Sequence, residues 1–465
     1  MKKRELIQLG VPAGDATEAT LVAIRAAVAD GMKKRKLNEI VSAIAATPDA
    51  YTDVPPWDDM ARSIVAAREA TPPFVERDSP APCEEWGSDL DPEARKQIHN
   101  ACRLPVSRAA ALMPDAHVGY GLPIGGVLGT HNAVIPYAVG VDIACRMKLS
   151  VLDMPVSTIR GAEGHLRNAL ESETAFGLGA SFERKKDHAV LEEDWTVSAI
   201  TAKLRDKAWS QLGTSGTGNH FVEFGTMTLE QDELGLKQGT YLALLSHSGS
   251  RGTGARVAQH YSRAAMDAHP ELPKDLAHLA WLDLDTDLGR EYWAAMQLMG
   301  NYASANHALI HQGLIRRLKA NVLFTVENHH NFAWKETHNG QPMIVHRKGA
   351  TPAGTGVLGI IPGSMATPGY IVRGRGHAPS LNSASHGAGR LMSRTKCKNT
   401  FTWNQARTFL KERNVVLMSA GLDEIPMAYK DIETVMAAQT NLVDVVARFD
   451  PRLVKMAPEG ERPED

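Results

Sequence analysis

The chain has 465 residues, of which 43% are apolar and 22% charged, with 51 Lys and Arg against 53 Asp and Glu. This is the composition of an ordinary globular protein, long enough for two or three domains. No run approaches the roughly 18 apolar residues of a membrane span, the start lacks the apolar core of a signal peptide, and the cysteines are few and scattered. We therefore expect a cytoplasmic protein with no membrane partner and no disulfide framework.

Helical patterns fill residues 1–70. Asp15 and Glu18 have the spacing of a capping box at a helix start. The apolar stripe that follows has helical spacing and consists of Leu21, Ile24 and Val28. A second helix is expected over residues 58–70.

The Pro-rich stretch 71–82 is typical of a linker. From about residue 100 the pattern changes to short apolar runs broken by glycines, which predicts strands and tight loops. Further elements are expected as helices over 195–211, 253–267 and 287–321, and as buried strands over 321–327 and 357–361. This mixture lacks the regular alternation of a doubly wound fold and predicts an α+β protein. We expect a helical element in residues 1–75 and a larger domain in residues 76–465.

Two motifs early in the larger domain pair a carboxylate with a possible metal ligand. Asp115 and His117 are two residues apart, so they point the same way on an extended segment. Asp142 and Cys145 lie in a turn-rich segment and could offer one cation a hard oxygen and a soft thiolate. Each pair alone also has an ordinary structural explanation.

Three later motifs add imidazoles. The first is a glycine-rich turn that matches neither the Walker nor the dinucleotide-binding spacing. The other two directly follow apolar, strand-like runs. The polar residues of interest in these motifs are Asn219, His220, Glu223, His247, Arg251 and His330.

These motifs together favour a metal site. Any single histidine here could be structural, but loops at strand ends are where functional sites are built. One carboxylate, one thiolate and three imidazoles are enough ligands for two metal ions. Softness alone would favour zinc, so the residues leave the metal open.

Residues 337–411, which we call the acid-free segment, contain no Asp or Glu. Such local positive charge indicates a polyanionic ligand, with a basic solvated face as the alternative. His386 lies in its middle among small residues, where a phosphate could approach closely. We interpret the missing acids as keeping carboxylates away from His386. The ten cations of the segment are Arg347, Lys348, Arg373, Arg375, Arg390, Arg394, Lys396, Lys398, Arg407 and Lys411.

Taken in order, these motifs resemble the RtcB family of RNA ligases over about residues 105–457. The resemblance implies mixed sheets surrounded by helices around a central dimetal cleft. It implies a ligase dependent on GTP and two Mn²⁺ ions, which joins RNA 3′-phosphate or 2′,3′-cyclic phosphate ends to 5′-hydroxyl ends. Its partners would be broken RNAs, such as transfer or ribosomal RNA, and the sequence indicates neither which RNA nor the oligomeric state.

The resemblance also implies individual roles. His386 would attack the α-phosphate of GTP to form a covalent histidine–GMP, and Asp115 would be a required acid. Cys145 would bridge the two metal ions, completed by Asp142 with His220 and by His247 with His330. The expected nucleotide contacts are Asn219, Glu223, Ser364, Ser385, His386, Gly387, Arg390, Tyr429 and Lys455. The expected RNA or phosphate contacts are Arg251, Arg347, Lys348 and Arg394.

Two departures from the family pattern and two alternatives remain. The family commonly has glycine after the bridging cysteine, whereas Arg146 here would add a cation beside the metals. Residues 1–70 resemble the family less closely.

A dinuclear metal phosphoesterase acting on RNA could use the same ligands but has no need of His386. RNA binding without catalysis would not explain the ligand set.

Overall fold

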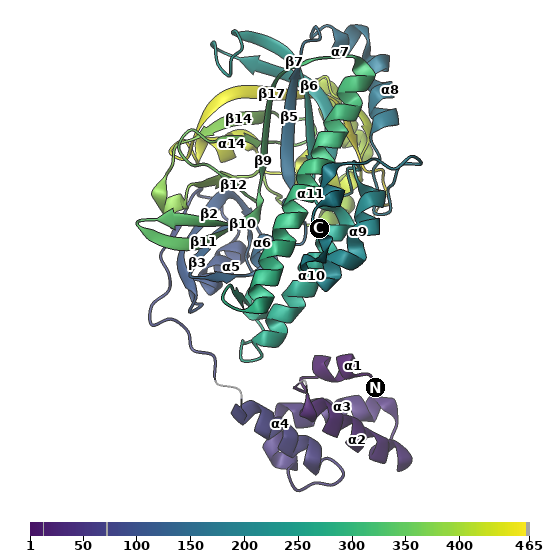
Figure 1. Ribbon diagram of the computed structural model, residues 1–465, viewed down its shortest axis with the longest axis vertical. Coiled ribbons are helices and arrows are strands. Elements are labelled where there is room, and N and C mark those ends of the chain that lie inside the picture. The colour runs from purple at the N-terminus through teal and green to yellow at the C-terminus, as the bar shows by residue number, and fades with distance from the viewer. Residues whose placement is uncertain (13, 71–72, 462–465) are drawn as a thin grey trace. The chain divides into compact units, whose positions relative to one another are not determined.

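The computed structural model describes residues 1–12, 14–70 and 73–461, which form two compact units (Figure 1). The N-terminal unit comprises Met1–Val75 with the short segment His269–Pro273. The main unit comprises Glu76–Ala268 and Lys274–Asp465. No helix in the described part of the chain combines the length and apolarity that a membrane crossing needs.

The described residues of the N-terminal unit are mainly helical. Its helices are α1 (Lys3–Gln8), α2 (Asp15–Ala29), α3 (Lys34–Ala46) and α4 (Asp58–Ala70), with a 3-10 turn at Pro48–Tyr51. They bury an apolar core of their own that includes Ile24, Val41, Ile44, Met60 and Ile64.

The structure corrects two details of the predicted first helix. Gly14 is the N-cap of α2, so Asp15 is already inside the helix and forms no capping box with Glu18. Val28 is 53% exposed, because the buried face of α2 passes through Ala23, Ile24 and Ala27 instead.

The first sheet of the main unit has the strand order β1-β2-β3-β11-β10. Its strands are β1 (Cys83–Glu85), β2 (Ser107–His117), β3 (Ile124–Thr130), β11 (Gln341–Lys348) and β10 (Asn331–His338). Only β1 and β2 pair in parallel. Two small ladders accompany this sheet: β4 (Ala133–Val134) with β8 (Leu282–Asp283), and β12 (Ala350–Pro352) with β15 (Ser383–Ser385).

The second sheet has the order β13-β14-β17-β6-β7-β5-β9, and β16 pairs with β17 outside this path. Its strands are β13 (Leu358–Ile361), β14 (Gly369–Gly374), β17 (Val443–Met456), β6 (Phe221–Leu229), β7 (Gly239–Ser248), β5 (Arg146–Leu152), β9 (Val322–His329) and β16 (Val416–Ser419). The central strands of this sheet bury side chains on both faces, which explains why their sequences are continuous apolar runs.

Helices surround the sheets, and the longest, α11 (Asp287–Leu318), runs beside β5 and β7 (Figure 1). Thr286 caps its start by accepting a hydrogen bond from the Gly289 amide. The other helices are α5 (Pro92–Cys102), α6 (Pro136–Val139), α7 (Thr158–Gly161), α8 (Glu163–Glu173), α9 (Ala199–Gln211), α10 (Arg251–Ala268), α12 (Arg394–Thr400), α13 (Trp403–Glu412) and α14 (Ile432–Ala437). Short 3-10 turns lie at Ala189–Glu192, Trp195–Val197, Ala277–Leu279, Ala378–Ser380, Leu422–Glu424 and Pro426–Ala428. The predicted α+β class is confirmed.

Candidate active site

Strand pairing gathers the predicted metal ligands at one edge of the second sheet. Cys145 immediately precedes β5 and His220 immediately precedes β6, while His247 lies near the end of β7. Because these strands are antiparallel, the starts of β5 and β6 lie beside the end of β7, as the pairs Arg146–Ser248 and Phe221–His247 demonstrate.

His330 joins this edge from between the two sheets. It is the single residue that separates the end of β9 from the start of β10. Its amide donates to the carbonyl of Cys145 (3.0 Å), which extends the pairing of β5 with β9 to the site.

The five predicted ligands lie within contact distance of one another. Cys145 Sγ is 3.4 Å from His220 Nε2 and 3.1 Å from His247 Nε2. His247 Nε2 is 3.3 Å from His330 Nε2, and His220 Nε2 is 3.1 Å from an Asp142 oxygen. They form two triads suited to a metal ion, one of Asp142, Cys145 and His220 and one of Cys145, His247 and His330. Cys145 belongs to both.

The chemistry of the donor set fits metal binding. His247 Nδ1 lies 3.2 Å from the carbonyl of Asn219, which can only accept, so Nδ1 carries the proton and Nε2 faces the cluster with its lone pair. The ring nitrogens His220 Nδ1 and His330 Nδ1 are buried and have no hydrogen-bond partner among the described residues. A Cβ at Gly249 would lie 2.1 Å from an Asp142 oxygen, so only glycine lets the backbone approach this carboxylate.

Ionisation within the cluster also favours a metal. Burial, together with neighbouring imidazoles, holds the pKa of His247 and His330 well below the usual value, so both are neutral at pH 7. Burial alone would raise the pKa of Asp142, but the hydrogen bond and charge of His220 outweigh it and lower the pKa to about 2. The cluster therefore offers the neutral imidazoles of His247 and His330 and the ionised carboxylate of Asp142.

His386 lies next to this cluster and is held by Asp115. The ring centroids of His386 and His330 are 5.0 Å apart. Asp115 Oδ2 accepts hydrogen bonds from His386 Nδ1 (2.7 Å), the His386 amide (3.2 Å) and the Gly387 amide (3.3 Å). Because Nδ1 donates, Nε2 keeps the lone pair for chemistry.

Asp115 itself is fully buried, in a stretch of β2 where the pairing with β3 is irregular. Burial would raise its pKa, but the electrostatic interaction and hydrogen bond with the His386 ring hold the pKa below the ordinary value. Gly389 permits this packing, because its φ is +75° and a Cβ there would lie 2.1 Å from the Asp115 carbonyl oxygen.

A cavity of about 630 Å³ connects the metal triads with His386. All five predicted metal ligands line it. Eight further predicted contacts line it as well: Asn219, Glu223, Ser364, Gly387, Arg390, Tyr429, Lys348 and Arg394.

Burial shifts the ionisation of two of these lining residues. It raises the pKa of Glu223 well above the usual range and lowers the pKa of Lys348 to about 7. Lys348 Nζ donates to the carbonyl of Tyr120 (2.7 Å).

Four predicted contact residues do not line this cavity. Arg347 is 1% exposed and its guanidinium pairs with Glu336 (2.7 Å). Arg251 is equally buried and donates to Thr214 and to the carbonyl of Gly177.

Lys455 and Ser385 do not line the cavity either. Lys455 pairs with Val222 across β17 and β6, so it lies on the opposite sheet face from Glu223, and its Nζ donates to the carbonyls of Leu170 and Thr174. Ser385 is fully buried next to His386.

Arg146 does carry a cation next to Cys145, as expected, but an acid compensates the charge. Its side chain is buried in an ion pair with Glu327 and also donates to the carbonyl of Gly300 in α11 (3.3 Å). Lys148 pairs with the other oxygen of Glu327 (2.8 Å). Glu327 lies two residues before His329, the ladder partner of Arg146 on β9, so the neighbouring strand supplies this acid.

The interpretation of the acid-free segment was wrong. The Asp115 carboxylate contacts His386 directly, and six of the ten cations form ion pairs with acids from other parts of the chain. Glu424 is an unpredicted cavity residue that pairs with Arg390 (3.2 Å) and Arg394 and accepts from the Tyr429 hydroxyl. A local absence of acids says nothing about acids that the fold brings in.

These features define a class of protein: an α+β domain in which a buried thiolate, imidazole and carboxylate cluster capable of holding metal lies beside a carboxylate-bound histidine. The family model described as tRNA-splicing ligase RtcB matches residues 97–456. The chain belongs to the RtcB family of RNA ligases.

Individual relatives agree with this. The chain is 34% identical over 405 residues to the RNA-splicing ligase RtcB of Escherichia coli K12, covering 79% of this chain and 95% of that protein. It is 31% identical over 430 residues to the tRNA-splicing ligase RtcB of Nanoarchaeum equitans, covering 76% and 90%. It is also 31% identical over 440 residues to the tRNA-splicing ligase RtcB of Archaeoglobus fulgidus, covering 78% and 90%. These matches support RNA ligase function and not the phosphoesterase alternative.

Proposed function

We propose that this protein joins RNA 3′-phosphate or 2′,3′-cyclic phosphate ends to 5′-hydroxyl ends, using GTP, Mn²⁺ and a covalent His386–GMP intermediate. The observation that carries the proposal is that His386, fixed by Asp115, shares one cavity with two metal-capable triads. A metal-dependent phosphoesterase would need the triads but not His386 and Asp115. The proposed catalytic domain is residues 76–465, with residues 1–75 as an accessory helical element.

The two triads would hold two Mn²⁺ ions through Cys145, Asp142, His220, His247 and His330. Bound there, the ions would supply charge neutralisation for the triphosphate and for the phosphoryl group in transfer. Neutral His247 and His330 and ionised Asp142 are the protonation states that such binding requires.

His386 would act as the nucleophile. Asp115 holds the proton on Nδ1, so Nε2 attacks the α-phosphate of GTP, a P–N bond forms and pyrophosphate leaves. An oxygen of the RNA 3′-phosphate then takes the guanylate from His386, and the 5′-hydroxyl oxygen finally attacks the activated 3′-phosphate and releases GMP. A cyclic end would first be hydrolysed to the 3′-phosphate.

Other lining residues would bind the nucleotide. Glu223 is buried and its raised pKa favours the protonated form, which can donate as well as accept a hydrogen bond toward guanine. Asn219, Ser364, Gly387 and Tyr429 would make further nucleotide contacts. Lys348, Arg390 and Arg394 remain our candidates for phosphate binding. We now propose that Arg251, Arg347, Ser385 and Lys455 support the cavity walls instead of touching ligand.

The test is incubation with GTP labelled at the α-phosphate, together with Mn²⁺. Label should remain on the denatured wild-type protein, disappear on a chase with 3′-phosphate RNA, and be absent from His386→Ala. His165→Ala, which removes an exposed histidine outside the cavity, is the matched control and should label normally. An unlabelled wild type, or a labelled His386→Ala, would refute the proposal.

A further inference from the structure

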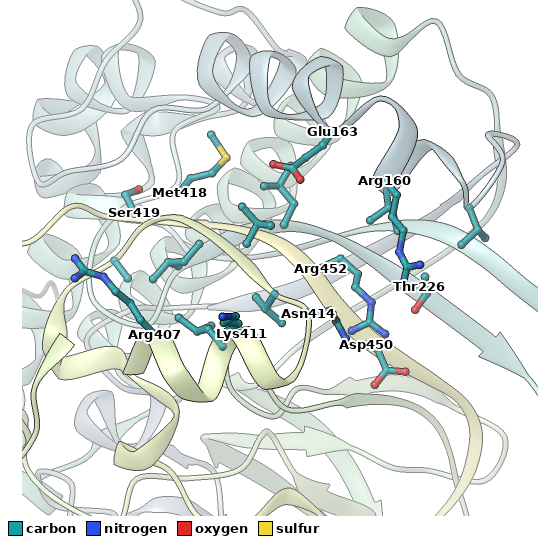
Figure 2. A pocket seen from close by; sticks show the side chains of 18 of the residues that line it. Arg160, Glu163, Thr226, Arg407, Lys411, Asn414, Met418, Ser419, Asp450 and Arg452 are labelled. Atoms are coloured by element: carbon teal, nitrogen blue, oxygen red, sulfur yellow. The ribbon is translucent and has the colours of Figure 1, made fainter. Parts of the chain in front are cut away.

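A second cavity, of about 1430 Å³, lies elsewhere in the main unit (Figure 2). Side chains enter it from α7, α13, the segment after α13 and β17. Its basic lining residues, which we call the groove cations, are Arg160, Arg407, Lys411 and Arg452.

The groove cations differ from most cations of the acid-free segment because they lack acidic partners. None of these four side chains forms an ion pair within the described ranges. The Arg452 guanidinium is the one that makes a side-chain hydrogen bond there, to the carbonyls of Arg413 and Pro451. Arg407 and Lys411 lie one turn apart on α13, where like charges repel. Both side chains are exposed, and an anion that binds the two together would relieve this repulsion.

The acids of the cavity are already partnered. Glu163 pairs with Arg167 (3.1 Å) and Asp450 with Arg448 (3.2 Å), neither of which lines the cavity. Glu459 accepts from the indole nitrogen of Trp403 (2.9 Å). Glu459 has no cationic partner among the described residues and keeps its charge, so the four groove cations outnumber the uncompensated acids of the cavity. The net positive charge attracts an anion with several charges.

The remaining lining suits nucleobases. Trp403 contributes an indole ring, and β16 contributes half-buried apolar side chains including Leu417 and Met418. Cations that follow a phosphate backbone, combined with aromatic and apolar surface for the bases, are the properties of single-strand binding sites.

A shared apolar wall connects the two cavities. Met365 and Met456 line the active-site cavity, and they pack in one core cluster with Leu410, Val415 and Ala420, which line the second cavity. A strand held in the second cavity would therefore lie on the same body as the reacting end.

We infer that the second cavity binds a single-stranded stretch of the RNA substrate away from its reacting end, with the groove cations on its phosphates. This inference rests on the proposed RNA-joining function. The second cavity supplies affinity for the body of the RNA, while the first performs the chemistry.

The experiment measures RNA binding to the full chain by fluorescence anisotropy across a salt series. The probe is a single-stranded RNA of about 20 nucleotides with a 3′-phosphate, longer than the roughly 4–16 nucleotides that one single-strand site covers. The variant is Arg407→Gln with Lys411→Gln. The matched control is Lys203→Gln with Arg256→Gln. It removes two exposed cations of the same unit that line neither cavity and form no ion pair among the residues described.

Loss of two phosphate contacts should weaken binding about tenfold at moderate salt and reduce the slope of log K against log salt by about 1.4. In ligation, KM for the RNA should rise with kcat unchanged. The control should match the wild type. Unchanged affinity and salt slope in the Arg407→Gln, Lys411→Gln variant would overturn the inference. The cavity would then be a candidate binding site for an acidic protein instead of RNA.

Labelling of His386 by GTP separates this test from the proposed function. Normal labelling with weakened RNA binding supports both. Normal labelling with unchanged RNA binding in the variant refutes only the RNA-binding role of the second cavity. Absent labelling of the wild type refutes the proposed function.

Discussion

Replacing Asp115 by Asn tests how the nucleophile is prepared. Asn keeps the size of the side chain but removes the negative charge that His386 Nδ1 contacts at 2.7 Å. The site is fully buried, so water cannot replace the lost charge. When His386 bonds to phosphorus, positive charge develops on the ring, and the carboxylate stabilises it.

The expected size follows from the hydrogen bond. A hydrogen bond to a charged group contributes about 1.5–3 kcal/mol, and each 1.36 kcal/mol changes a rate about tenfold. Guanylylation in Asp115→Asn should therefore be about 10- to 150-fold slower. The affinity for GTP should change little, because Asp115 does not line the cavity.

The assay is single-turnover labelling by GTP at several concentrations, which separates the maximal rate from the apparent GTP affinity. Metal content and thermal stability are measured on the same preparation, because a general loss of structure would lower all of them together. A maximal rate within about threefold of wild type, which corresponds to under 1 kcal/mol, would refute the proposed role of the carboxylate.

Three further predictions concern metal, stability and pH. Cys145→Ala should lose most bound manganese by elemental analysis, because both triads share this thiolate, whereas the buried Cys102→Ala should keep a full load. Glu327→Gln should lower the free energy of urea unfolding by about 3 kcal/mol, because it leaves Arg146 buried without its counter-charge. Burial would raise the pKa of Glu327, but the neighbouring cations outweigh burial and lower the pKa to about 2. The ionised carboxylate therefore stabilises the fold above about pH 4.3, and this stabilisation is lost as the pH falls toward 2. Glu327→Gln should lose less stability than the wild type over that pH range. Burial lowers the pKa of Lys348 to about 7, so its positive charge is present below that pH and lost above it. The GTP affinity of the wild type should therefore decline between pH 6 and 8, and Lys348→Arg should flatten this decline because arginine stays charged. An equal decline in the variant would contradict this role of Lys348.

The ligand cluster could be predicted because its signals are local. Cys145, His220 and His330 each lie immediately beside a strand, and an apolar run next to a polar turn marks such a position in the sequence. Asp115 could be singled out but not given a role. Its contact with His386 crosses 271 positions and depends on an irregular stretch of β2 that no local pattern reveals.

The errors concern charges whose partners are distant in sequence. Arg347 was predicted to bind phosphate. Its guanidinium instead forms an ion pair with Glu336, which lies just before the acid-free segment and on the other strand of a β-hairpin. Lys455 was predicted to contact the nucleotide, yet its register against Val222, which follows an irregularity between Pro451 and Leu453, places it on the opposite sheet face from Glu223. Sequence composition shows how many charges a segment has, whereas only the fold shows which of them are neutralised.

The position of His330 limits how this protein can vary in evolution. A connection between two sheets normally tolerates added residues, because loops adjust at little cost. Here the connection from β9 to β10 is a single residue whose ring belongs to the ligand cluster and whose amide is bonded to Cys145. One inserted residue would turn the next side chains to the opposite faces of their strands and remove a ligand. Variation in length is therefore expected at connections such as the one from β6 to β7, and excluded at the junction of the two sheets.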